Sequence, residues 1–209
     1  LAECLFYALA CQHNKQQQYI EPDFSQETEV VSKPLEELVA RANSYSKRIT
    51  QDLNRFSEEE LQLFRKIAPF TFYDNSFDEF SGETVLDHYL ISHADFLDLF
   101  TKYGVKGNEV SRLIEYGLIS GGGRHEIIVE KGDLSGFQND NLVLTFTTES
   151  DERTTFEYSA FHLTDTAKAL IEILGIETDD EFFRELGEEF KNRVKELPIS
   201  IEMLGVNEF

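Results

Sequence analysis

Two pairs of histidine and carboxylate come closest to a chemical motif in this chain of 209 residues. They are Asp87-His88 and His93-x-Asp95, and both side-chain types are ligands that Zn²⁺ accepts. The two histidines are five residues apart, which puts them on different faces of a helix, and no third imidazole or thiol lies nearby in the sequence. The spacing therefore argues against a metal site, and we expect no cofactor.

Two other stretches contain residue types that serve catalysis. Gly121-Gly122-Gly123 has the composition of a phosphate-binding loop, but such a loop ends in Gly-Lys-Ser/Thr and opens a helix, whereas Arg124-His125 leads into an expected strand. Cys11 and His13 are too close in sequence to indicate a nucleophile and its base, and no Gly-x-Ser-x-Gly elbow occurs. The sequence thus singles out no catalytic residue, although an acid and a base could be hidden among its 40 carboxylates.

Net charge is the strongest constraint on the partner. The chain has 19 Lys and Arg against 40 Asp and Glu, a formal charge of −21. Because affinity for nucleic acid comes largely from cations that neutralise phosphates, nucleic acid is an unfavourable partner. For a DNA-binding regulator, the expected phosphate contacts would be Arg41, Lys47, Arg48, Arg55 and Arg112.

The composition also bears on the compartment. No apolar run approaches the roughly 20 residues that span a bilayer, so we expect no membrane association. Cys4 and Cys11 fit buried thiols in a reducing compartment, which predicts a cytoplasmic protein. The chain opens without Met on the apolar stretch Leu1 to Ala10, from which we expect a missing upstream region and a tendency to self-association.

The elements expected around these residues make an α+β chain that is mainly helical. Residues 1–80 should form an N-terminal helical part, in which Ser57 and Glu60 make a capping box and Pro69 ends the helix. The aromatic and acidic residues between 70 and 80 follow neither a helical nor an alternating pattern, which predicts a loop whose rings enter the core or form an interaction surface. The candidate surface consists of Phe72, Tyr73, Phe77 and Phe80.

Residues 81–175 are expected to form a winged-helix-like part with a small antiparallel sheet. A helix that Gly104 closes is followed by a second one, Asn108 to Tyr116, that stops at Gly117. Strands are then predicted over 126–130, 141–147 and 154–163. The second helix would be the recognition helix, but its net charge of −1 (Glu109 and Glu115 against Arg112) favours protein binding over DNA binding.

Residues 176–209 should form a C-terminal acidic helix and tail. Thr164 and Gly175 delimit the preceding helix, and Thr178 to Glu181 has the pattern of a second capping box. Pro198 limits the acidic helix.

Four short stretches resemble the ordered landmarks of a group of uncharacterised bacterial domains that is similar to the Abi-alpha abortive-infection proteins. They are Tyr45–Thr50, Phe56–Phe64, Leu113–Ile119 and Leu163–Leu170. The resemblance implies a bacterial cytoplasmic protein, helical first and winged-helix-like afterwards, with a role in defence against phage. It implies no catalytic residues.

We therefore expect a non-enzymatic protein-interaction module, a sensor or a scaffold, that binds another protein or a second copy of itself. The alternatives are a DNA-binding winged-helix regulator and an enzyme with an unrecognised carboxylate site.

Overall fold

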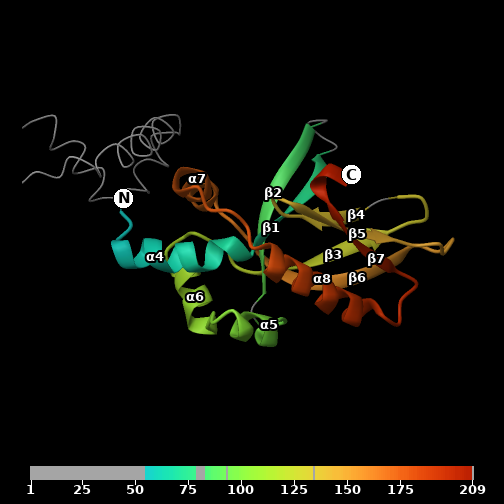
Figure 1. Ribbon diagram of the computed structural model, residues 1–209, viewed down its shortest axis with the longest axis horizontal. Coiled ribbons are helices and arrows are strands. Elements are labelled where there is room, and N and C mark those ends of the chain that lie inside the picture. The colour runs from blue at the N-terminus through green and yellow to red at the C-terminus, as the bar shows by residue number, and fades with distance from the viewer. Residues whose placement is uncertain (1–54, 79–82, 93, 134, 209) are drawn as a thin grey trace, which may run out of the picture.

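The protein is built on a seven-stranded antiparallel sheet (Figure 1). The computed structural model describes residues 55–78, 83–92, 94–133 and 135–208. The strands lie in the order β3-β6-β2-β1-β4-β5-β7. They are β1 (Thr71–Asp78), β2 (Glu83–Ile91), β3 (Gly123–Val129), β4 (Ser135–Gln138), β5 (Leu142–Thr147), β6 (Thr154–His162) and β7 (Ser200–Gly205).

The sheet is strongly curved, so that strands far apart in its order meet. The ring of Tyr158 on β6 lies 5.2 Å from that of Phe137 on β4, although two strands stand between them in the order. Edge strand β3 likewise returns to lie beside β4. The strands thus curve around a common interior, to which β5 contributes the buried ring of Phe146, 5.2 Å from Phe156 on β6.

Five α-helices pack against one end and one face of this sheet in the described part of the chain. They are α4 (Glu58–Ile67), α5 (Leu97–Lys102), α6 (Gly107–Glu115), α7 (Asp165–Leu174) and α8 (Asp180–Val194), with 3₁₀ turns η1 (Ala68–Phe70) and η2 (Val206–Glu208). Figure 1 shows α4, α5, α6 and α7 gathered at one end of the molecule, with α8 lying along the sheet. No helix in these described ranges is long and apolar enough to cross a membrane.

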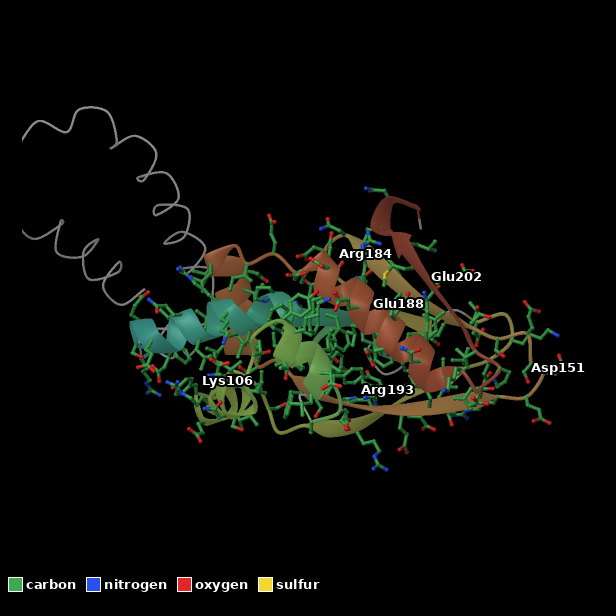
Figure 2. All side chains as sticks on the ribbon, turned by 60° about the horizontal axis from the view of Figure 1, so that its bottom comes forward. Lys106, Asp151, Arg184, Glu188, Arg193 and Glu202 are labelled. Atoms are coloured by element: carbon green, nitrogen blue, oxygen red, sulfur yellow. The ribbon has the colours of Figure 1, made fainter. Side chains whose placement is uncertain are left out.

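Helix α8 covers the inner face of the sheet with its apolar side. Phe190 is fully buried, and its ring lies 5.6 Å from Phe137 and 5.9 Å from Phe146 and Tyr158. Gly187 allows the close approach, because a Cβ there would lie 2.8 Å from Met203 Cε. The opposite side of α8 carries exposed charges such as Arg184 and Glu188 (Figure 2), so its amphipathic sequence fixes its orientation.

Several local sequence signals are confirmed. Ser57 accepts from the Glu60 backbone and Glu60 accepts from the Ser57 N–H at 2.6 Å, so the capping box begins α4. Thr164 caps α7, and Gly175 ends it with a φ of 59°. Gly117 ends α6 with the expected Schellman bonds, the Leu118 N–H donating to the Leu113 carbonyl at 2.9 Å.

The predicted winged-helix-like and mainly helical fold is wrong. The expected strands exist as β3, β5 and β6, but they do not form one small hairpin sheet. Strand β3 pairs with β6, whereas β5 pairs with β4 and β7, so β5 and β6 lie in different parts of a larger sheet. Four strands that the sequence pattern did not reveal, β1, β2, β4 and β7, complete it.

The predicted aromatic loop is in fact strand β1. Phe72 and Tyr73 point to opposite faces of the sheet, yet both are buried. The strand therefore lacks the alternation of apolar and polar residues by which a strand with one exposed face is recognised. The predicted boundary between residues 80 and 81 therefore falls inside the β1–β2 hairpin. The N-cap of α8 is Asp179 rather than Thr178, whose side chain instead contacts Asp140.

Candidate functional site

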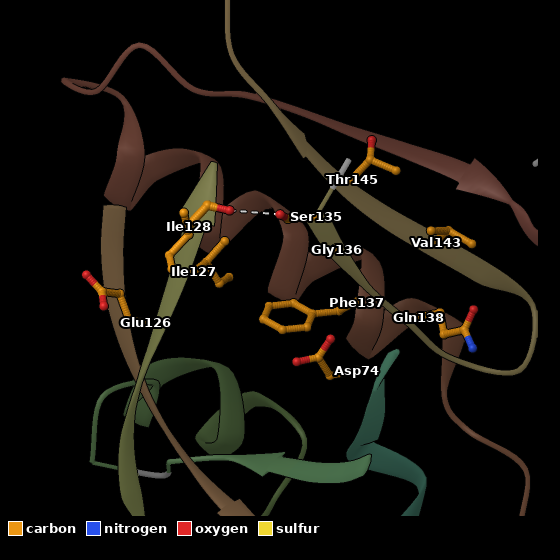
Figure 3. A pocket seen from close by; sticks show the side chains of 10 residues that line it. All are labelled: Asp74, Glu126, Ile127, Ile128, Ser135, Gly136, Phe137, Gln138, Val143 and Thr145. Atoms are coloured by element: carbon orange, nitrogen blue, oxygen red, sulfur yellow. Dashed lines mark hydrogen bonds between the residues drawn. The ribbon is translucent and has the colours of Figure 1, made fainter. Parts of the chain in front are cut away.

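A cleft opens between β3 and β4, two consecutive strands that a tight turn connects. The strands do not form a ladder with each other, because β3 pairs with β6, and β4 pairs with β1 and β5. One hydrogen bond bridges them near the turn, from Ser135 Oγ to the Ile128 carbonyl at 2.8 Å (Figure 3). Beyond that bond they enclose a cleft of about 470 Å³.

One wall of the cleft is the unpaired edge of β3. Along a strand the backbone N–H and C=O of one residue point to the same side, and the next residue points to the other. The Ile128 carbonyl faces β4, so the backbone groups of Glu126 and Arg124 face the cleft as well. Strand β3 pairs with no second strand among the described residues. This edge can therefore accept hydrogen bonds from another extended chain.

The cleft is lined by residues from both the inner and the outer face of the sheet. Phe137 and Asp74 come from the inner face and lie between β3 and β4 in Figure 3. The remaining lining residues are Glu126, Ile127, Ile128, Ser135, Gly136, Gln138, Val143 and Thr145. No described residue of this lining is cationic, so the cleft carries negative charge.

Asp74 is the chemically unusual group of the cleft. It is half-buried, and it lies directly opposite Phe137 on β4 and opposite Asp87 on β2. Burial, and then the charge of Asp87, raise the pKa of the Asp74 carboxyl. Asp87 has a cationic neighbour, since Lys168 Nζ lies 3.6 Å from its Oδ1, but Asp74 has no ion pair or hydrogen bond among the described residues.

Behind Asp74 the inner face carries a cluster of four polar rings: Tyr89, His125, Tyr158 and His162, which we call the ring cluster. His125 lies 4.9 Å from His162 and 5.3 Å from Tyr158 between ring centroids, and Tyr89 lies 4.6 Å from His162. Burial, and then the charges of Asp87 and Asp74, raise the pKa of Tyr89 to about 12.

Burial also affects the protonation of Tyr158 and His125. It raises the pKa of Tyr158, and together with His162 it lowers the pKa of His125. The ring of His125 is therefore neutral at neutral pH, and its buried Nε2 has no hydrogen-bond partner among the described residues. The interior behind the cleft is thus polar, and His125 brings no positive charge to it.

A second polar network lies on the other face of β1. Tyr73 donates to Asp140 Oδ1 at 2.7 Å, while the backbone N–H of Thr178 donates to Asp140 Oδ2 at 2.8 Å. The ring of Tyr73 also packs on His88 at 4.5 Å. Because Asp140 binds both Tyr73 and Thr178, this network joins β1 to the start of α8.

Two of the four residues of the predicted aromatic interaction surface, Phe72 and Tyr73, are buried. Phe72 is fully buried against Tyr89 and Phe137, and Tyr73 is buried in the network with Asp140. Phe77 lies in β1, and Phe80 lies outside the described residues. Neither Phe72 nor Tyr73 is therefore available to a partner.

Of the predicted nucleic-acid contacts, the structure describes Arg55 and Arg112. Arg112 bonds Glu59 at 2.7 Å and Tyr116 at 2.8 Å, so its charge is already paired. Arg55 is exposed at the start of the described chain. The other three candidates, Arg41, Lys47 and Arg48, lie outside the described residues.

Of the two histidine and carboxylate pairs, the structure describes only Asp87-His88 in full. Asp87 and His88 are neighbours in β2, so their side chains point to opposite faces of the sheet. His93 lies outside the described residues. Within the described ranges, no group of three or more His, Cys, Asp or Glu side chains could hold a metal ion.

Sequence reasoning missed Asp74 and Glu126, the two carboxylates of the cleft. A signal was available for Asp74, since it stands two residues from Phe72 and so shares the face of a buried ring once the strand is recognised. Glu126 looks like any exposed strand residue. Its place beside the cleft depends on the separation of β3 from β4, which no local pattern encodes.

Comparisons with known proteins add no relative: no family model, curated protein or solved structure matches the chain. The cleft and its charges are therefore the features of this protein that indicate a function.

Proposed function

We propose that the protein is a non-enzymatic interaction module that receives an extended segment of a partner protein in the β3–β4 cleft. The observation that carries the proposal is the unpaired edge of β3, whose backbone groups at Arg124 and Glu126 face the cleft beyond the bond between Ser135 and Ile128. An exposed strand edge is a template for another strand, and proteins use it to bind peptides through main-chain hydrogen bonds. A scaffold or sensor can work in this way without chemistry.

The hydroxyl groups of the cleft also favour binding over catalysis. Ser135 donates to the Ile128 carbonyl at 2.8 Å, and Thr145 donates to the Glu202 carbonyl at 3.4 Å. A nucleophilic hydroxyl needs a neighbouring base that accepts its proton, and in these two cases a backbone carbonyl accepts it. Neither hydroxyl is thus prepared for attack on a substrate.

An enzyme is the second candidate, because one observation favours it. Asp74 has a raised pKa and shares the cleft with Glu126, and a carboxylic acid that keeps its proton can act as a general acid. Turnover of a glycoside or ester that Asp74→Asn abolishes would select this candidate over the first.

DNA binding by a winged helix is no longer a candidate, since the fold is different and Arg112 is paired. The role in phage defence that the resemblance implies stays a prediction.

Site-specific photo-crosslinking in the cells that produce the protein would test the interaction module. Ile128 lines the cleft and its side chain is 39% exposed, whereas Leu97 on α5 is 52% exposed and does not line the cleft. We expect Ile128→p-benzoylphenylalanine to form a discrete adduct with one protein and Leu97→p-benzoylphenylalanine to form none. Equal adducts at both positions, or no adduct at 128, would overturn the proposal.

A further inference from the structure

We infer that the segment bound in the β3–β4 cleft is basic, and that it adds to β3 as a strand while placing a lysine or arginine side chain beside Asp74. This inference deepens the proposed function and depends on it, since it names the chemical class of the partner.

The geometry of strand addition sends alternate side chains of the bound segment in two directions. Side chains along β3 alternate between the inner and outer faces of the sheet, and those of a strand paired with its free edge would alternate in the same way. Side chains that point inward would meet Asp74 and Phe137, and those that point outward would meet Glu126 and Ile128. Each direction therefore presents one carboxylate and one apolar group.

Charge complementarity then decides the class of side chain. Asp74 is half-buried, is repelled by Asp87, and has no cation beside it among the described residues. The described cations nearest the cleft in sequence are engaged elsewhere: Arg124 bonds Glu157 at 3.1 Å, and Lys131 bonds Asp151 at 2.7 Å. An incoming ammonium or guanidinium group would offset the repulsion between the two aspartates.

The surroundings of Asp74 suit a long cationic side chain. The rings of Phe137, Tyr158 and Tyr89 occupy the same inner face, and a lysine or arginine can pack its methylene stem on such rings while its charged end meets a carboxylate. A carboxylate or phosphate ligand would instead meet two negative charges. The chain as a whole, at −21, also attracts a basic segment over longer range.

The test uses the full chain and capped heptapeptides of alternating valine and threonine, with lysine, norleucine or glutamate at the central position. Binding is measured by calorimetry at low salt, and each peptide is also made with N-methylated backbone amides at alternate residues. We expect lysine to bind about tenfold more tightly than norleucine, glutamate to bind weakest, and N-methylation to abolish binding.

Protein variants separate the charge from the strand. The lysine peptide should bind the unchanged protein about tenfold more tightly than the norleucine peptide, whereas Asp74→Asn should bind the two peptides about equally. The matched control is Asp98→Asn, which removes the same charge from an exposed residue of α5 that does not line the cleft and has no ion pair among the described residues; it should leave the ratio unchanged.

Failure of the two ideas would look different. Equal binding of the lysine and norleucine peptides, with N-methylation still inhibitory, would refute the basic partner and leave the interaction module standing. Lysine-dependent binding that survives N-methylation would refute strand addition. Binding by none of the peptides at millimolar concentration would refute both the basic partner and the interaction module. A dimer of the free protein that the peptides dissociate would also refute both, because the segment in the cleft would then belong to a second copy of the chain.

Discussion

Phe190→Ala is the substitution that most directly tests how α8 holds the curved sheet. Phe190 is fully buried, and its ring meets five others, on β4, β5, β6 and the residue before α5: Phe96, Phe137, Phe146, Phe156 and Tyr158. Removing the ring leaves a cavity at the point where these elements converge. Two of its partners, Phe137 and Tyr158, connect that point to the cleft and to the ring cluster.

The size of the effect follows from the burial. An aromatic side chain buries roughly 150–250 Å², which at about 25 cal/mol/Å² corresponds to about 4–6 kcal/mol as an upper bound. Buried phenylalanines replaced by alanine lose about 3–5 kcal/mol. We therefore expect Phe190→Ala to lower the free energy of unfolding by about 4 kcal/mol, and the melting temperature by about 8–16 °C for a chain of this length.

Urea denaturation followed by circular dichroism would measure the loss, with Leu97→Ala as the control. Leu97 is 52% exposed, so its truncation should change the free energy of unfolding by less than about 0.5 kcal/mol. A loss below about 1 kcal/mol for Phe190→Ala, with an unchanged denaturant slope, would mean that α8 does not pack its aromatic face into the sheet, and the reasoning would fail.

The remaining predictions concern single residues of β1, β4 and the loop after β4. Asp74→Asn should raise the melting temperature at pH 7, because burial and Asp87 raise the pKa of Asp74, so that its ionised form opposes folding. Below about pH 4 the carboxyl is protonated in both the folded and the unfolded chain, and the gain in melting temperature should vanish. A gain that persists in acid would contradict this explanation. Asp140→Asn should lower the melting temperature at pH 7. Burial alone would raise the pKa of Asp140, but hydrogen bonds from Tyr73 and Thr178 lower it, so the difference should shrink as the pH falls through that pKa in a thermal scan. Gly136→Ala should cost about 1–3 kcal/mol in urea denaturation, since its Cβ would lie 2.3 Å from the Leu144 carbonyl oxygen; a loss under about 0.5 kcal/mol would show that β4 can shift without penalty.

Helix ends were the most predictable features, because the signals that set them are local. Ser57 and Glu60 act within one turn of α4, and Gly175 ends α7 through its own positive φ. Such signals need no tertiary partner, and they were read correctly from the sequence. Where two capping residues were adjacent, at Thr178 and Asp179, the contact of Thr178 with Asp140 decided between them.

Strands were predictable in proportion to how regularly their side chains alternate. In β6, Phe156 and Tyr158 are buried between exposed neighbours, and the strand was found. In β1 the neighbours Phe72 and Tyr73 are both buried, and β4 is four residues long with a glycine inside it, so neither shows the pattern. The error in fold class follows from these missed strands.

By itself, the sequence determined the acidic character of the protein, its helix boundaries and the regularly alternating strands. These properties depend on composition or on residues within a few positions of each other. Only the tertiary structure decided that β3 pairs with β6 and leaves its other edge open beside β4, and that Asp74 lies in the resulting cleft opposite Asp87. Strand order and curvature arise from contacts between distant segments, here the packing of the sheet around Phe190, and no local pattern of residues encodes them.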